Sequence, residues 1–143
     1  MKPIKVFLDS SVIIAGLAST TGGSHKVLAL AELKLIRPCI SEEVVSEVLR
    51  NIQKKLPYSL PHFYTLFKIL PFKIIDATDK SLEYAKTLIN EKDAPILAAA
   101  ITGQADWLLS LDRHFLTEFL KEKVDLSICS PKEFLTKIEI NNR

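Results

Sequence analysis

Cysteine, net charge and long apolar runs are all scarce in this chain of 143 residues. The two cysteines, Cys39 and Cys129, lie far apart and outside any CxxC spacing, so we expect reduced, buried side chains. No apolar run approaches the roughly 20 residues that a membrane-spanning helix needs, and the N-terminus lacks a secretory signal. We therefore expect a cytoplasmic protein without a membrane partner. The net charge of +2 is compatible with a polyanionic partner but does not by itself indicate one.

The chain does contain enough apolar residues for a folded core. Hydrophobic residues make up 48% of the chain and charged residues 25%, a balance typical of a globular protein. No internal repeat, low-complexity tract or long linker divides the sequence. We therefore expect one domain over residues 1–143.

Apolar runs of strand length alternate with segments of helix length. A short, continuous apolar run indicates a parallel strand that is covered on both faces. The segment 4–8 is such a run. Further strands are expected at 35–40, 106–111 and 124–129, and 72–76 is expected as a strand or an extended segment. Helices are expected at 25–33, 42–55, 62–70, 80–91, 93–104 and 130–138, with N-caps at Ser24, Ser41, Asp93 and Ser130. This alternation predicts an α/β fold with a parallel sheet.

Two aspartates, Asp9 and Asp112, each follow an apolar strand directly. In open parallel α/β sheets, ligands bind beyond the carboxyl ends of the strands. Asp93, at the start of a helix, is a third carboxylate compatible with this edge; its alternative role is to cap that helix. Several carboxylates at one edge repel each other unless a cation lies between them. Because oxygen ligands favour Mg²⁺ or Mn²⁺, the pattern predicts a site for such an ion.

A fourth carboxylate is expected from the helix at 42–55, which has an apolar face of valine, leucine and isoleucine. At about 100° per residue, Glu43 points away from that face and towards solvent. Glu42 and Glu47 lie on opposite flanks of the face, where a side chain can reach a cleft beside the sheet. Helix geometry leaves both of them open.

Asp106 also borders an apolar strand, but it precedes the strand that Asp112 follows. A strand rises about 3.3 Å per residue, so these two carboxylates should lie on the order of 20 Å apart, at opposite edges of the sheet. We expect a turn or capping role for Asp106.

Four segments together resemble the PIN-domain ribonucleases. They are VFLDSSVIIAGL at 6–17, CISEEVVSEVL at 39–49, EKDAPILAAAITGQADWLLSLDRHF at 91–115 and SPKEFL at 130–135. The last two segments are similar to the PIN group regarded as toxins of toxin–antitoxin systems. The resemblance implies a PIN-like three-layer α/β/α sandwich with a central, mostly parallel β-sheet.

The resemblance also implies which side chains act. The family's catalytic and metal-binding acids match Asp9, Glu47, Asp93 and Asp112. The match selects Glu47 from the two glutamates that helix geometry leaves open. Two polar positions of the family match Ser11 and Ser110, which would support the acids by hydrogen bonding. Because every acidic position is kept, the sequence favours an active enzyme.

The activity implied by this resemblance is endonucleolytic, metal-dependent hydrolysis of RNA. One or two Mg²⁺ or Mn²⁺ ions would bind the scissile phosphate and lower the pKa of an attacking water. The products would carry 5′-phosphate and 3′-hydroxyl ends. The resemblance further implies a small antitoxin protein as partner and self-association, commonly as a dimer.

Cations are needed to offset the repulsion between clustered acids and RNA. The candidates of choice are Arg113, directly after Asp112, and Arg50 and Lys54 on the helix that carries Glu47. Other candidates are Lys26, Lys55 and His114. Each lysine has an alternative role as ordinary surface charge, and the alternative role of His114 is packing beside Phe115. We place His114 outside the core site.

Two other functions compete with the nuclease. A PIN-like scaffold or RNA-binding subunit with little turnover would keep the fold and lose the chemistry. A metal-dependent phosphatase or a receiver-like regulatory domain would use a similar α/β sheet. A receiver needs a pair of acids after the first strand, and FLDSS offers one.

Overall fold

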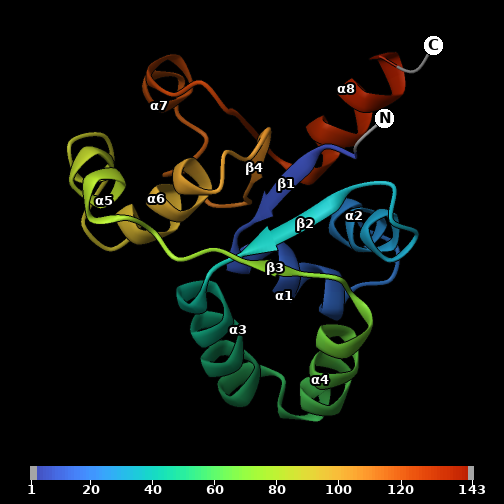
Figure 1. Ribbon diagram of the computed structural model, residues 1–143. Coiled ribbons are helices and arrows are strands. Elements are labelled where there is room, and N and C mark those ends of the chain that lie inside the picture. Colours follow the sequence, from blue (N-terminus) through green and yellow to red (C-terminus); the bar gives the residue numbers. More distant parts are fainter. Residues whose placement is uncertain (1–2, 142–143) are drawn as a thin grey trace.

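The fold is built on a five-stranded sheet in which every strand pair is parallel (Figure 1). The computed structural model describes residues 3–141. The strand order is β3-β2-β1-β4-β5, so the first strand lies at the centre. The strands are β1 (Lys5–Leu8), β2 (Arg37–Ile40), β3 (Lys73–Ile74), β4 (Trp107–Leu109) and β5 (Ser127–Cys129). All five strands expected from the sequence are therefore present, with shorter bounds.

Helices cover both faces of this sheet and complete a three-layer α/β/α sandwich, as the sequence predicted (Figure 1). Helices α1, α2 and α8 pack together, and α5 packs along α6. The helices are α1 (Ser10–Ala18), α2 (Gly23–Glu32), α3 (Glu42–Lys55), α4 (Leu60–Ile69), α5 (Asp79–Lys86), α6 (Ala94–Thr102), α7 (Glu118–Lys123) and α8 (Pro131–Asn141). None of the helices among residues 3–141 is long and apolar enough to cross a membrane.

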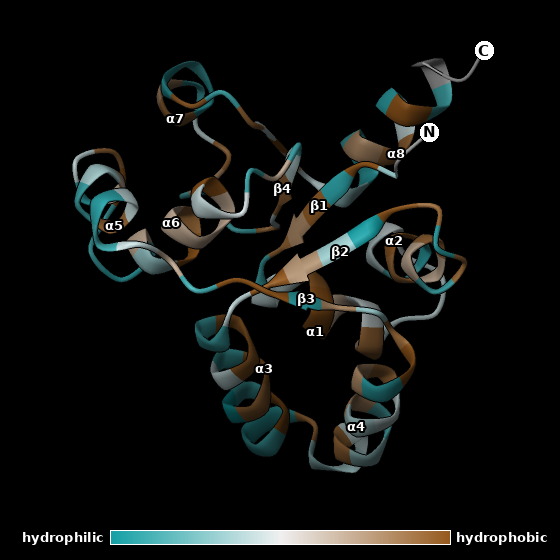
Figure 2. Ribbon diagram, in the orientation of Figure 1, coloured by the Kyte–Doolittle hydropathy of each residue, from teal (hydrophilic) through white to brown (hydrophobic). Residues whose placement is uncertain are grey.

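The core lies between the sheet and its helices. The strand residues Val6, Phe7 and Leu8 are fully buried, as a parallel strand covered on both faces requires. Helix α6 is apolar on nearly every side and buries a continuous run from Ile96 to Ala100, which is typical of an interior helix. The hydropathy colouring in Figure 2 shows the same apolar character along α1. Both cysteines are free and buried, as expected.

One expected N-cap is wrong, and a second has the expected position but no capping bond. Helix α2 begins at Gly23 with Gly22 in the N-cap position, so Ser24 lies inside the first turn. Asp93 occupies the N-cap position of α6, but its side chain accepts no hydrogen bond from the helix. Pro95 in that first turn has no N–H to offer a cap. The carboxylate of Asp93 is therefore available for other contacts.

Other differences concern short elements. Helix α5 ends at Lys86, before the expected end at residue 91, and neither α1 nor α7 was expected. By contrast, Ser41 caps α3 as predicted and accepts a hydrogen bond from the N–H of Val44 at 3.3 Å. This cap fixes the start of the helix that carries Glu47.

Candidate active site

The fold delivers the four predicted acids to the carboxyl edge of the sheet. Asp9 directly follows β1, and Asp112 follows the adjacent strand β4. The backbone N–H of Asp9 donates to the carbonyl of Leu109 at 3.1 Å, so the two strand ends stay in register. Glu47 comes from α3, and Asp93 stands at the start of α6.

Asp9 is the most buried of these acids, at 4% exposure. Its Oδ2 accepts hydrogen bonds from the hydroxyls of Ser110 at 2.7 Å and Ser11 at 3.1 Å. Its Oδ1 accepts from the backbone N–H of Ser10 at 2.7 Å. Burial raises the pKa of Asp9 despite these bonds, and the nearby charge of Glu47 adds to the rise. An ionised carboxylate in this position is therefore stabilised by any cation that enters the site.

Ser10 connects Asp9 with Glu47. Its hydroxyl donates to Oε2 of Glu47 at 2.6 Å and lies 3.4 Å from Oδ1 of Asp9. Glu47 is half-buried, whereas Glu42 and Glu43 are exposed. The structure therefore brings Glu47, and not Glu42, to Asp9. Sequence analysis missed Ser10, because its partner lies 37 residues away on another helix.

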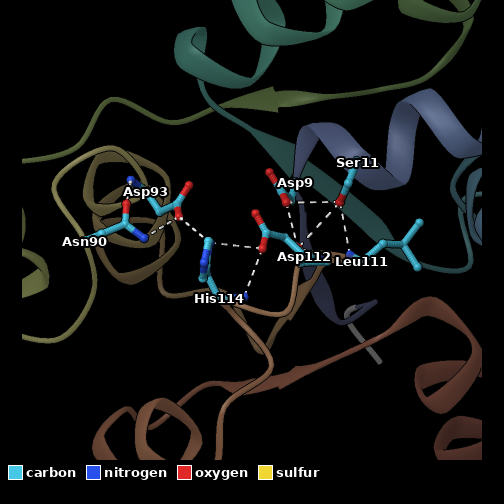
Figure 3. A network of polar contacts seen from close by, with 8 residues as sticks. Asp9, Ser11, Asn90, Asp93, Leu111, Asp112 and His114 are labelled. Atoms are coloured by element: carbon cyan, nitrogen blue, oxygen red, sulfur yellow. Dashed lines mark hydrogen bonds and ion pairs between the residues drawn. The ribbon is translucent and has the colours of Figure 1, made fainter.

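Ser11 lies beside Asp9 in Figure 3, and both Ser11 and Ser110 donate hydrogen bonds to its carboxylate. The hydroxyl of Ser110, fully buried, donates to Asp9 and accepts from the N–H of Asp112 at 2.9 Å. Ser11 accepts from the N–H of Leu111 at 3.0 Å. The two serines thus tie the end of β1 to the loop that follows β4.

The second half of the cluster is organised around His114 (Figure 3). Its Nδ1 lies 3.3 Å from Oδ1 of Asp112 and 3.7 Å from Oδ2 of Asp93. Asp93 is buried, and its Oδ2 also accepts a hydrogen bond from Nδ2 of Asn90 at 2.7 Å. Sequence analysis placed His114 outside the core site, and the structure corrects this: the imidazole lies between two of the acids. Asn90 was missed.

This donor set fits a hard divalent cation. Ser10 joins Asp9 with Glu47, and His114 lies between Asp93 and Asp112. Within residues 3–141, His114 is the only potential cation in ion-pair contact with any of these four acids. The ligand atoms of Asp93, Asp112 and His114 lie within 4.8 Å of one another. Carboxylate oxygens are the ligands that Mg²⁺ and Mn²⁺ prefer. The arrangement can therefore hold a cation whose charge offsets the repulsion between the acids.

The expected RNA-binding cations lie around this cluster. Arg50 and Lys54 line a cleft of about 450 Å³, together with Glu47, Asn51, Gln53 and Lys92. Arg113 is exposed next to Asp112. Lys26 and Lys55 are not part of the cleft lining. Lys92 was missed, although its position beside Asp93 in the chain was a usable signal.

Asp106 lies at the opposite edge of the sheet. Its Oδ2 accepts a hydrogen bond from the backbone N–H of Lys5 at 2.8 Å, where β1 begins. Its own N–H donates to the carbonyl of Lys5 at 2.9 Å. The structural role expected for Asp106 is confirmed.

The structure therefore combines an all-parallel α/β/α sandwich with a candidate metal site at the carboxyl edge of its sheet. The model of the PIN domain family matches residues 5–114, a span that includes all four acids. The chain belongs to this family. No curated protein matches the chain.

Solved structures of similar fold cover most of the chain. One match is VapBC2 from Rickettsia felis, a structure bound to a DNA fragment from the VapBC2 promoter. It matches at 19% identity and a TM-score of 0.64, over 87% of this chain and 97% of its own. VapBC-1 from nontypeable Haemophilus influenzae matches at 17% identity and a TM-score of 0.63, over 90% of this chain and 99% of its own. VapC20 from Mycobacterium tuberculosis, a sarcin–ricin loop cleaving toxin, matches at 14% identity and a TM-score of 0.53, over 85% of this chain and 98% of its own. At 14–19% sequence identity, these matches show a similarity of fold.

Proposed function

We propose that the protein is a metal-dependent endoribonuclease in which Asp9, Glu47, Asp93 and Asp112 hold one or two Mg²⁺ or Mn²⁺ ions. One observation carries this proposal: the acids from four separate elements are joined at one sheet edge by short polar contacts. Two of these acids, Asp9 and Asp93, are buried, and Glu47 and Asp112 are half-buried. Placing carboxylates close together away from water is unfavourable without a counter-charge, and a bound cation would supply one.

Metal bound to these acids would lower the pKa of an attacking water and stabilise charge on the phosphate and the leaving 3′-oxygen. Ser110 and Ser11 hold the carboxylate of Asp9 in one orientation by donating to its Oδ2. Ser10 keeps Glu47 beside Asp9 in the same way. Asn90 orients Asp93 through the bond to its Oδ2. These serine and asparagine side chains would therefore position the carboxylates for metal binding.

We assign the approach of RNA to the cleft beside Glu47. Arg50, Lys54 and Lys92 line this cleft, and Arg113 is exposed near Asp112. Cations beside an acidic site can bind the phosphates that flank the scissile one and so offset the repulsion from the carboxylates. RNA bound in this cleft would reach the metal from the side of α3.

A cleavage assay tests the nuclease. Purified protein is incubated with structured and single-stranded RNA in Mn²⁺, in Mg²⁺ or in EDTA, alongside Asp9→Asn. We expect endonucleolytic products with 5′-phosphate ends from the wild type in metal, and none in EDTA or from the variant. Equal cleavage by both proteins would refute the assignment of the site. Metal and RNA binding without cleavage would favour the scaffold alternative.

We further propose that this nuclease acts as the toxin of a toxin–antitoxin pair in the cytoplasm. The similar structures of VapBC2 and VapBC-1, and of the toxin VapC20, support this proposal. Induced expression of the wild type should arrest growth, whereas Asp9→Asn should not. Co-expression with the product of a short neighbouring reading frame should restore growth and yield a complex. We propose a homodimer as the free form, which light scattering would report as twice the chain mass.

A further inference from the structure

We propose that His114 is a nitrogen ligand of the metal and that it makes the site selective for Mn²⁺ over Mg²⁺. This inference rests on the proposed metal site and extends its donor set beyond the acids. It concerns a side chain that the sequence alone placed outside the site.

The spacing of the three donor atoms matches a coordination shell. Ligand bonds of about 2.1 Å place adjacent ligand atoms of an octahedral ion about 3.0 Å apart and opposite ones about 4.2 Å apart. Nδ1 of His114 lies 3.3 Å from Asp112 Oδ1 and 3.7 Å from Asp93 Oδ2, between these limits. An ion among the three atoms therefore needs only small side-chain adjustments.

The backbone around His114 holds the imidazole in this place. Its N–H donates to Oδ1 of Asp112 at 2.9 Å. The next residue, Phe115, is 1% exposed and donates its N–H to the carbonyl of Asp112 at 3.0 Å. The buried phenyl ring thus anchors a tight turn that presents His114 to the acids. The His114 side chain itself is 56% exposed, which leaves one side of the site open to water and substrate.

Nitrogen in the donor set changes which ion binds best. Mg²⁺ is held by carboxylates and retained waters. First-row transition ions also accept imidazole nitrogen, and Mn²⁺ belongs to that series. Carboxylates alone would serve both ions, so a ligating His114 strengthens the binding of Mn²⁺ more than that of Mg²⁺.

His114 has one competing role at this position. Its imidazolium could act only as a counter-charge that sits between Asp93 and Asp112 while the metal is absent and moves aside when it binds. The two roles differ in whether nitrogen contacts the bound ion. A spectroscopic measurement on the metal-loaded protein separates them without any use of activity.

The experiment is pulsed electron paramagnetic resonance of the full chain loaded with Mn²⁺. We expect ¹⁴N modulation from a directly bound nitrogen in the wild type, and its loss in His114→Ala and His114→Gln. His62→Ala is the matched control, because His62 is exposed on α4 and away from the acids, and it should keep the signal. Absence of ¹⁴N modulation in the wild type, or its persistence in both His114 variants, would overturn the inference.

Calorimetric titration gives the selectivity. We expect the ratio of Mn²⁺ to Mg²⁺ affinity to fall by about tenfold or more in His114→Ala, the size of effect seen when a metal site loses one supporting group. An unchanged ratio contradicts the inference while leaving the proposed nuclease intact. Failure of the wild type to bind either ion would instead remove the proposed function itself.

Discussion

The two edges of the central sheet use the same residue types in opposite ways. At the amino edge, Asp106 precedes β4, is exposed and pairs with the backbone of Lys5. At the carboxyl edge, Asp112 follows β4 and joins a cluster of acids around His114. The difference shows that strand direction, more than local sequence, decides which aspartate is structural and which can bind a ligand.

The clefts at the two edges also differ in the charge of their lining, which is a local separation of charge. The amino edge carries a cleft of about 360 Å³ whose charged lining residues are all basic: Lys5, Lys34, Arg37 and Lys73. The carboxyl edge carries four acids with His114 between two of them, and Arg50, Lys54 and Lys92 line the neighbouring cleft. A net charge of +2 averages over this separation and hides it. Net charge is therefore a poor guide to what either edge binds.

The sharpest test of this contrast replaces one aspartate at each end of β4. Asp112→Asn should lower kcat/KM for RNA cleavage by about a hundredfold or more, as expected when an active site loses one electrostatic stabiliser. Asp106→Asn changes the same residue type at the other edge and should leave cleavage within about twofold, because its contact is with backbone. Initial rates with a labelled RNA in Mn²⁺ measure both. A comparable loss in the two variants would mean that the edges do not differ in function.

Much of this contrast was predictable from the sequence. Short segments rich in apolar residues located the strands, with 72–76 left as a strand or an extended segment, and strand polarity alone separated Asp106 from Asp112. Helix geometry narrowed the glutamate to two candidates, and the resemblance to PIN proteins chose Glu47. The cap at Ser41 followed from local pattern, since a cap contacts a residue three positions away.

The contacts that cross between elements were not predictable. Ser10 reaches Glu47 across 37 positions, and nothing near Ser10 in the sequence signals that helix α3 passes beside it. His114 lies between acids because α6 and the loop after β4 approach each other in space, which a single sequence does not record. The Asp93 side chain makes no capping bond to α6 and instead accepts a hydrogen bond from Asn90, a contact that its N-cap position does not indicate.

A second prediction compares how much two serines contribute to the free energy of unfolding. Ser110→Ala removes a donor to Asp9 and leaves the buried N–H of Asp112 without its acceptor. We expect a loss of about 1–3 kcal/mol in the free energy of unfolding, measured with urea. Ser127→Ala, at the exposed start of β5, should change it by less than about 0.5 kcal/mol. Equal losses would show that the bonds to the acids add nothing beyond ordinary packing.

Burial of Asp9 should make the stability of the metal-free protein depend on pH. Because burial raises the pKa of Asp9 above its usual 3.8, the folded protein binds this proton more tightly than the unfolded chain. The contribution of Asp9 to the free energy of unfolding therefore falls as pH rises from 3.8 through the folded pKa, and is constant above it.

Asp9→Asn removes this contribution. Urea unfolding in EDTA should show the variant gaining stability relative to the wild type across that pH window, and the gain should reach a plateau above it. Asp106→Asn, on the exposed amino edge, controls for loss of one carboxylate. A difference between Asp9→Asn and the wild type that does not change with pH would contradict a raised pKa for Asp9.

The smallest effects are expected from the cations of the two edges. Lys54→Ala removes one cation from the cleft beside Glu47, whereas Lys73→Ala removes one from the cleft at the amino edge. If Lys54 contacts one phosphate, the slope of log K against log salt should fall by about 0.7 for single-stranded RNA, with a uniform loss of affinity across RNA sequences. Lys73→Ala should leave the slope unchanged, although both variants lose the same charge. Fluorescence anisotropy over a range of KCl measures both slopes, with each lysine variant made in the Asp112→Asn background, where we expect cleavage to be slow. Electrostatic attraction between exposed charges falls off within about 10 Å at 0.1 M salt. An effect of Lys54 alone would therefore place the RNA at the carboxyl edge. Equal slopes for the two variants would mean that the net charge of the protein, and not a local contact, attracts the RNA.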